Sequence, residues 1–237
     1  MRAALKSLLR SRSFATAVIL ILGVAIALQT SMVAVVNAYL LRSLPYPESD
    51  RLHSITYAQQ PVFPPEGLED LEWAALSDVI EHPIAWDLDM FYLLGGEYPE
   101  AAPGAWITWG FTQGLGIRPV LGRAFTENDF VPGQPQVALI SDALWRDRYA
   151  RDPRIVGRTF SAYVSDRPDD PEIFTIVGVL PDGFWHFNPY TQVLTPLRGK
   201  SYPYLARLAP DVPAAVAAQR IERLCGVRLV DFLKEEL

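Results

Sequence analysis

The most extended feature of the hydrophobic pattern lies near the N-terminus. Residues Phe14–Leu41 form a run of 28 residues without a charged side chain, directly after the basic stretch Arg2–Arg12. As an α-helix this run would be about 42 Å long, and it exceeds the roughly 20 residues that cross the hydrocarbon core of a bilayer. The pattern therefore predicts a transmembrane helix over 14–41. The basic residues that precede it predict a cytoplasmic N-terminus, residues 1–13.

The same segment has the features of a secretory signal peptide. Arg2–Arg12 suits the basic n-region, Phe14–Val24 has the length of an h-region, and Ala25-Ile26-Ala27 fits a cleavage site. The apolar run continues for 14 residues past Ala27, whereas polar mature sequence normally follows a cleavage site. We therefore predict a retained anchor, with cleavage as the alternative. Both interpretations place the rest of the chain outside the cytoplasm.

The remaining residues, 42–237, interleave short strand-like and helix-like patterns without a regular βαβ rhythm. This arrangement predicts a mixed α+β domain, in one body or two lobes, and not a doubly wound sheet. The expected strands are 52–57, 105–111, 136–141, 157–164, 172–180 and 204–210, the fourth and fifth forming a hairpin through 165–171. The expected helices are 67–82, ended by Pro83; 142–150, capped by Ser141; and a closing helix after Asp211 with a break at Gly226.

The charge distribution is uneven along the chain. The net charge is −6, but residues 1–42 carry five basic side chains and no acidic one, which leaves a balance of −11 for the rest. Nucleic-acid binding needs clustered Lys and Arg, so an acidic body excludes nucleic acid as a partner. The single cysteine, Cys225, cannot form an internal disulfide, and we expect it to be a small buried side chain in a helix.

Candidate catalytic and ligand-binding patterns are incomplete. None of His53, His82 and His186 has a partner at metal-ligand spacing. The sequence GKS at 199–201 lacks the earlier glycine of a phosphate-binding loop, and GLG at 114–116 is followed by Pro119 where a dinucleotide fingerprint needs glycine. No serine lies in a G-x-S-x-G elbow. The sequence thus predicts no enzyme, no catalytic, cofactor-binding or metal-binding residue, and no cofactor.

Two further groups have alternative interpretations. Asp169 and Asp170 lie in an expected loop, where we interpret them as solvated charges. Phe184, Trp185 and Phe187 form an aromatic loop within 183–190 that suits either a contact surface or core packing, and we favour core packing.

Five segments, in order, resemble the MacB-like periplasmic core domain of ABC-transporter permeases. They are LRSLPYPESDRL after the first apolar run, LGIRPVLGRAFTENDF, VALISDALWRDRYARDPRIVGRTF, FTIVGVLPDGF and YLARLAPDVPAAVAAQRIERL. The similarity spans about residues 1–230 and is nearest to the orphan permease group. It implies one membrane helix that leads to an α+β extracytoplasmic domain, here residues 42–237, in the inner membrane.

The resemblance also implies partners. Family members act with a cytoplasmic ATPase and three further membrane helices, and some contact a periplasmic or membrane-fusion partner. They transmit conformational change across the membrane, and their periplasmic domain is not an enzyme. The printed sequence stops at Leu237 before any further helix, so we expect that transport requires companions. A secreted or signal-anchored binding module that uses the loop near Trp185 is the main alternative, and a hydrolase with a novel site is the third hypothesis.

Overall fold

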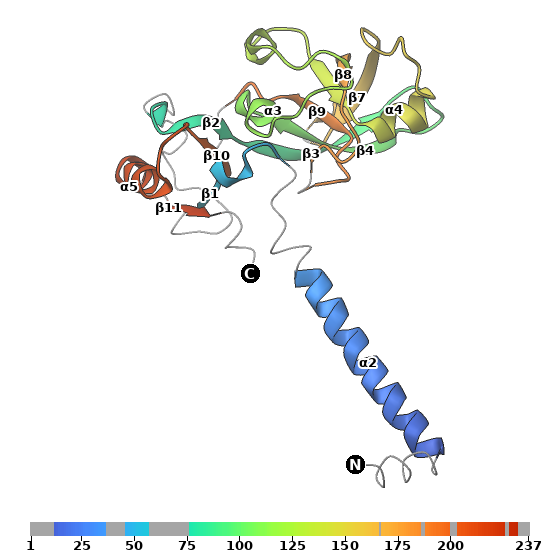
Figure 1. The fold of residues 1–237 in the computed structure, drawn as a ribbon. Coiled ribbons are helices and arrows are strands. Elements are labelled where there is room, and N and C mark those ends of the chain that lie inside the picture. The colour runs from blue at the N-terminus through green and yellow to red at the C-terminus, as the bar shows by residue number, and fades with distance from the viewer. Residues whose placement is uncertain are drawn as a thin grey trace. The chain divides into compact units, whose positions relative to one another are not determined.

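The computed structural model describes residues 12–36, 46–56, 76–165, 167–185, 188–199, 203–225 and 228–231. The chain divides into two compact units, Met1–Ser43 and Leu44–Leu237, each with its own architecture (Figure 1).

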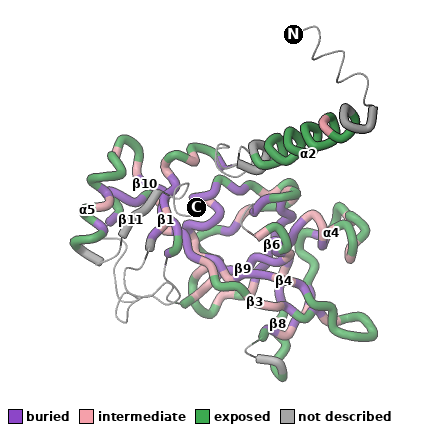
Figure 2. Tube along the Cα trace, turned by 90° about the horizontal axis from the view of Figure 1, so that it is seen from below, coloured by how far each residue is buried: buried purple, intermediate pink, exposed green. Residues whose placement is uncertain are grey.

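The first unit contains one long helix, α2 (Arg12–Val36), of 25 residues. Its described side chains, 16–32, are exposed except for the half-exposed Val18, as the green tube in Figure 2 shows. The hydroxyls of Thr30 and Ser31 donate to the carbonyls four residues earlier, each at 2.8 Å, so neither needs water as a partner. Within the described residues, no helix combines the length and the apolar character of a membrane span. Residues 37–41 of the predicted span lie outside the described part of the chain.

The second unit contains two sheets. The smaller sheet has the strand order β11-β1-β10-β2, and all its pairings are antiparallel. Ala217 and Ile221 of helix α5 (Ala214–Cys225) pack in one buried cluster with Ile55 and Ala206 of this sheet, because α5 turns a narrow apolar stripe toward the strands. The strands are β1 (Leu52–Thr56), β2 (Ile80–Ile84), β10 (Leu205–Leu208) and β11 (Arg228–Asp231).

The larger sheet closes into a six-stranded barrel. Its order is β8-β6-β9-β4-β3-β7, and β7 pairs again with β8, so the ring is complete; β5 (Leu121–Gly122) pairs with β8 outside the ring. Pairings β6–β8 and β4–β9 are parallel and the others in the ring are antiparallel. The barrel strands are β3 (Trp86–Leu93), β4 (Glu100–Ile107), β6 (Val137–Ile140), β7 (Thr159–Val164), β8 (Arg167–Val179) and β9 (Val193–Pro196).

Alternation along the strands fills the barrel with apolar side chains. Phe91, Phe160 and Phe174 lie inside it, and the ring centroid of Phe174 is 5.6 Å from that of Phe91 and 5.3 Å from that of Phe160. Alternate residues on the outside of the same strands join a second core that includes Leu52 and Leu205 of the smaller sheet, so the two sheets share buried side chains. Helix α4 (Asp142–Tyr149) packs Leu144, with Trp145 and Tyr149, against the barrel cluster.

Several sequence predictions are confirmed. The α+β class is correct, as are the strands that begin at Leu52 and Val137. Ser141 caps α4 by accepting a hydrogen bond from the backbone N–H of Leu144 at 3.1 Å. Segments β7 and β8 pair as the predicted hairpin.

The predicted helix over 67–82 is wrong at its C-terminal end. Residues 67–75 lie outside the described part of the chain, Leu76–Val79 form a turn, and Ile80–Ile84 form strand β2 with Pro83 inside it. Proline is tolerated there because β2 is an edge strand of the smaller sheet, so the backbone N–H that proline lacks is not needed for pairing on the free side of the strand.

Three other boundaries differ from the prediction. The strand predicted for 105–111 ends at Ile107, and helix α3 (Gly110–Gly114) begins three residues later. Strand β8 begins at Arg167, so most of the predicted loop 165–171 belongs to the hairpin, and Asp169 and Asp170 are exposed in a strand. The closing helix ends at Cys225, and Arg228–Asp231 form β11, because the extended chain pairs with β1; the predicted break at Gly226 lies outside the described residues.

Candidate functional site

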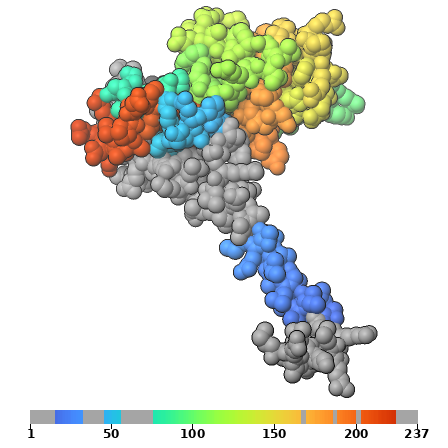
Figure 3. Space-filling view, viewed as in Figure 1, coloured from blue at the N-terminus to red at the C-terminus, as the bar shows by residue number. Residues whose placement is uncertain are grey.

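The first described residues of the second unit form a junction segment, Tyr46–Arg51, which carries the chain from the N-terminal unit into β1. Figure 3 shows this part of the chain, in cyan, beside the red C-terminal residues. The segment ends in a short 3-10 helix, η2 (Ser49–Arg51), and Glu48 before it has left-handed backbone angles. Two arginines hold this segment against the smaller sheet.

Arg207 of β10 is the central contact of the junction segment. Its side chain is buried, with 6% exposed, and its guanidinium donates to three backbone carbonyls. The acceptors are Gly114 O at 2.6 Å, Pro47 O at 2.7 Å and Glu48 O at 3.1 Å. Burial and the neighbouring charge of Arg51 lower the pKa of Arg207, yet an arginine stays protonated in proteins. One buried cation therefore joins the junction segment, α3 and the sheet.

Arg51 makes a second connection. It donates from Nε and Nη2 to the carbonyl of Leu208, at 3.0 and 2.6 Å, and forms ion pairs with Glu48 and Glu81. Burial opposes the charge of Arg51, but the hydrogen bonds from Glu81 and Glu48 outweigh it and raise its pKa. The two arginines thus bind both ends of the junction segment to β10.

Glycines allow the close approach of α3. Gly116 has φ +65°, and a Cβ there would lie 2.8 Å from Cγ of Pro47. A Cβ on Gly114 would lie 2.5 Å from Cδ1 of Ile84. Close packing therefore explains the GLG sequence, which lies at the end of α3 and not between a strand and a phosphate-binding helix.

The chain crosses between the two sheets at Ala85, and Thr108 holds this crossing. Ala85 N donates to Thr108 Oγ1 at 3.0 Å, and Thr108 N donates to Ala85 O at 3.1 Å. Four aromatic rings surround the same crossing in edge-on or tilted contacts: Trp86 lies 6.1 Å from Phe111, 5.5 Å from Trp185 and 4.9 Å from Tyr204 between ring centroids. Such contacts make the joint between the sheets stiff.

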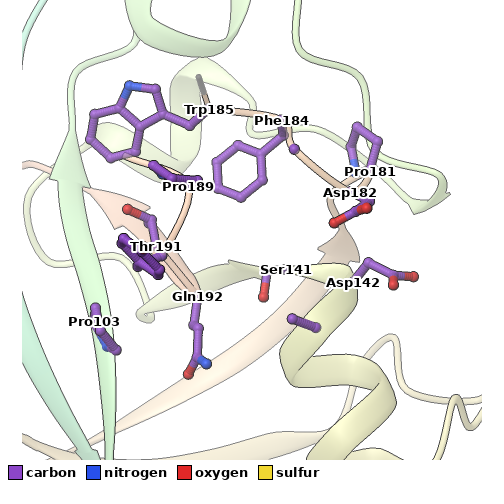
Figure 4. Close-up of a pocket in the computed structure, with 13 residues that line it drawn as sticks. Pro103, Ser141, Asp142, Pro181, Asp182, Phe184, Trp185, Pro189, Thr191 and Gln192 are labelled. Carbon is purple, nitrogen blue, oxygen red and sulfur yellow. The ribbon is translucent and has the colours of Figure 1, made fainter. Parts of the chain in front are cut away.

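The aromatic loop contributes to this joint. Trp185 is 1% exposed and its ring lies 5.0 Å from that of Phe111, so the prediction of core packing is confirmed for Phe184 and Trp185. Phe187 and His186 lie outside the described residues. Phe184 and Trp185 also line a cavity of about 260 Å³, between the start of α4 at Ser141 and Asp142 and the segment that contains Thr191 and Gln192 (Figure 4). Its rim is polar on the α4 side.

The other residues that the sequence singled out do not form a reactive site. Among the described residues, no group of three His, Cys, Asp or Glu side chains lies close enough to bind a metal. His53 is buried on β1, and burial lowers the pKa of His82 on β2, which favours a neutral ring. Lys200 and Ser201 lie outside the described part of the chain. Cys225 ends α5, and its side chain is not among those described.

The sequence did not indicate the role of Arg207 or Arg51. Arginine side chains are usually exposed to solvent, and the acceptors of Arg207 are backbone carbonyls that carry no residue-type signal. In the sequence, the prolines at 45 and 47 and the glycines at 114 and 116 are the residues that suggest close packing of backbone segments.

Comparison with known proteins gives a consistent assignment. A family model described as "MacB-like periplasmic core domain" matches residues 13–224. No curated protein sequence matches the chain.

Two solved structures share the fold. The periplasmic region of MacB from Actinobacillus actinomycetemcomitans has a TM-score of 0.56 at 16% identity, over 76% of this chain and 88% of that one. The extracellular domain of the noncanonic ABC-type transporter YknZ from Gram-positive bacteria has a TM-score of 0.50 at 14% identity, over 76% and 99% of the two chains. The resemblance carried by the five sequence segments is thereby confirmed. Because the family model covers most of its length, this chain belongs to the MacB-like periplasmic core domain family of ABC-transporter permeases.

Proposed function

We propose that this chain is a membrane-anchored portion of an ABC-transporter permease, and that its extracytoplasmic domain transmits conformational change between the membrane and a partner. Family membership supports the transporter context. The domain acts mechanically and performs no catalysis of its own. Its partners are an ATPase and the remaining permease helices, together with a periplasmic or membrane-fusion protein.

The anchor is the apolar run Phe14–Leu41. Its 28 uncharged residues exceed a bilayer's requirement, and the five basic residues within 1–42 include four on its N-terminal side. Helix α2 covers residues 14–36 of this region, and the hydroxyls of Thr30 and Ser31 donate to backbone carbonyls within the helix, as lipid demands. These features support a single inner-membrane span with the acidic domain outside the cytoplasm.

The observation that carries the mechanical role is the binding of the junction segment by Arg207. Pro47 and Glu48 are among the first described residues of the domain after the proposed anchor. Arg207 joins their carbonyls to α3 and β10, so a displacement of Pro47 and Glu48 acts on a folded sheet. The aromatic joint around Trp86 then connects this sheet to the barrel.

Membrane extraction tests the anchor. We expect the full chain to remain in the membrane fraction after an alkaline carbonate wash, with an intact N-terminus by sequencing. Release of a shortened protein that begins at Leu28 would contradict the anchor and favour the secreted binding module.

Hydrogen exchange tests the mechanical role. The full chain, purified in nanodiscs with its copurifying ATPase, is compared with and without ATP. We expect ATP to change the exchange of 46–56 and 205–208, and Arg207→Met to abolish that change while ATP hydrolysis continues. Arg220→Met is the matched control, because the contact of Arg220 within the described residues is an exposed ion pair with Asp78 at 3.3 Å. An undiminished ATP response in Arg207→Met would contradict the proposal.

A further inference from the structure

The two sides of the barrel differ in what covers them. Side chains that point inward from the strands form the barrel cluster, so the alternate side chains point outward. On one side these outward residues, such as Ala105 and Val177, are buried in the core that the barrel shares with the smaller sheet. On the side formed by β3, β7 and the first part of β8 they are uncovered. Leu88, Tyr92 and Ile173 are 56%, 40% and 63% exposed there.

The uncovered side chains form one continuous surface. Tyr92 of β3 lies directly opposite Tyr163 of β7. Ile173 of β8 lies opposite Ser161, the next outward residue before Tyr163 on β7. Two further outward residues extend the surface along β3, because side chains on one face recur at every second position. This outer apolar face consists of Leu88, Met90, Tyr92, Tyr163 and Ile173. A contiguous exposed apolar surface of this kind marks an interaction site, whereas scattered apolar side chains do not.

Negative charge is concentrated in the strands that carry the outer apolar face. Residues 86–107, which contain β3, β4 and the loop between them, include four acidic residues and no lysine or arginine. Residues 159–175, which contain β7 and the first part of β8, include four acidic residues and one arginine, Arg167, whose side chain lies outside the described part of the chain. Eight acidic residues against one basic residue give these two stretches a balance of −7, which is most of the −11 carried by the chain after residue 42.

Exposed carboxylates surround the outer apolar face. Glu97 lies in the loop that follows β3, and Asp169 and Asp170 lie in the hairpin of β7 and β8; all three are exposed. Arg148 forms an ion pair with Glu100 and so offsets one of the charges in this region. The face therefore combines an apolar centre with an acidic rim, and the complementary surface is apolar with a cationic rim.

The dimensions of the outer apolar face suit a short segment of chain. From Leu88 to Tyr92 it is about 13 Å long, and the three strands make it roughly 10 Å wide. A stable interface between folded proteins buries about 800 Å² on each partner, which is several times this area. A second copy of the chain would also bring one acidic rim against another, and an anionic membrane surface would repel the rim.

We propose that the outer apolar face is a docking surface for a partner protein, which places on it a short segment of apolar side chains flanked by lysine or arginine. The apolar side chains cover Tyr92 and Ile173, and the flanking cations lie beside the exposed carboxylates of the rim. This inference goes beyond the proposed transmission through the junction segment and does not depend on it.

Site-specific photo-cross-linking of the full chain in its host cells tests this inference. The cross-linker is benzoylphenylalanine, introduced as Tyr92→benzoylphenylalanine or Ile173→benzoylphenylalanine. Tyr190→benzoylphenylalanine is the matched control, because Tyr190 is a tyrosine with 79% exposure in the segment beside the cavity at α4. We expect both positions on the face to cross-link to the same polypeptide and the control position not to do so. Mass spectrometry should place the cross-link in an apolar segment flanked by lysine or arginine.

Charge reversal tests the contribution of the acidic rim. In the Tyr92→benzoylphenylalanine chain, Glu97→Lys combined with Asp169→Lys is expected to lower the yield of the adduct by about threefold or more, because rim charges govern the rate of association. Asp182→Lys combined with Glu222→Lys changes the net charge equally at exposed positions elsewhere and should leave the yield unchanged.

Four results would overturn the inference. They are no adduct beyond that of the control position, an adduct with a second copy of the chain or with lipid, a cross-linked segment without lysine or arginine, and equal yields from the two charge-reversed chains. None of these results would alter the expected ATP response of residues 46–56, so a failure here is distinguishable from a failure of the proposed function.

Discussion

Replacement of Arg207 by methionine is the perturbation that depends most directly on the contacts described here. Methionine retains most of the side-chain length and apolar contact but donates no hydrogen bond. The carbonyls of Pro47, Glu48 and Gly114 then lose a charged donor at 2.6–3.1 Å in a buried setting. Each such bond contributes about 1.5–3 kcal/mol, and non-additivity within one group reduces the sum, so we expect a loss of about 3–5 kcal/mol.

Urea unfolding of the full chain in detergent measures this loss. Trp86 and Trp185 lie at the joint beside α3 and report its unfolding by fluorescence. With a slope of about 2 kcal/mol per molar urea, the midpoint should fall by roughly 1.5–2.5 M. Within the described residues, the control Arg220→Met removes an exposed ion pair, worth at most about 1 kcal/mol. A loss below about 1 kcal/mol for Arg207→Met, or equal losses in both variants, would refute the reasoning.

Three further predictions test the packing and electrostatics of the domain. Burial alone would raise the pKa of Asp129. Hydrogen bonds from Arg123 and Thr126 outweigh this effect, and the net result is a pKa below the ordinary value near 4. The ionised Asp129 therefore stabilises the folded state above that ordinary pKa, and this stabilisation is lost as the pH falls through the lowered value. In urea unfolding from pH 2 to 7, Asp129→Asn should be less stable at pH 7 and should lose less stability as the pH falls. An unchanged loss of stability in acid would contradict this assignment. Gly116→Ala should destabilise more than Gly133→Ala in the same unfolding assay, because both have positive φ but only at Gly116 would a Cβ meet a neighbour, Pro47, within 4 Å; equal losses would exclude the close contact. Phe174→Ala should cost about 3–5 kcal/mol and Phe174→Leu clearly less in thermal unfolding, because Phe174 fills the barrel interior; a tolerated alanine would argue against a packed barrel.

Local signals in the sequence predicted much of the fold. Ser141 before an amphipathic turn predicted the start of α4, and the apolar run at 137–140 predicted a strand that is buried on every residue. These features are set by neighbours within a few residues, so a sequence pattern is sufficient to identify them.

Non-local pairing decided the elements that the sequence misassigned. Ile80 belonged to the predicted helix over 67–82, but it lies in β2 because β10 supplies a partner strand more than 120 residues later. Leu229 fitted the stripe of a closing helix, yet it pairs with Ile55 of β1. Helical periodicity over a few residues cannot distinguish these cases from short strands.

The candidate site was even less accessible to sequence reasoning. Arg207 bonds to carbonyls 93, 159 and 160 positions away, and any residue type presents such carbonyls. The cavity beside Asp89, Trp106 and Gln136 likewise gathers residues from the ends of several strands that no motif connects. The apolar run Phe14–Leu41 and the five family-like segments were the parts of the functional interpretation that the sequence alone could supply.

Labelling of single cysteines in intact spheroplasts tests the central claim most directly. In a Cys225→Ser background, Ser77→Cys places a thiol on an exposed residue of the domain, and Ser7→Cys places one in the basic N-terminus. We predict that a membrane-impermeant maleimide labels Ser77→Cys at once and labels Ser7→Cys only after the membrane is dissolved. Labelling of both sites before detergent is added, or of Ser7→Cys alone, would contradict an anchored chain whose acidic domain lies outside the cytoplasm.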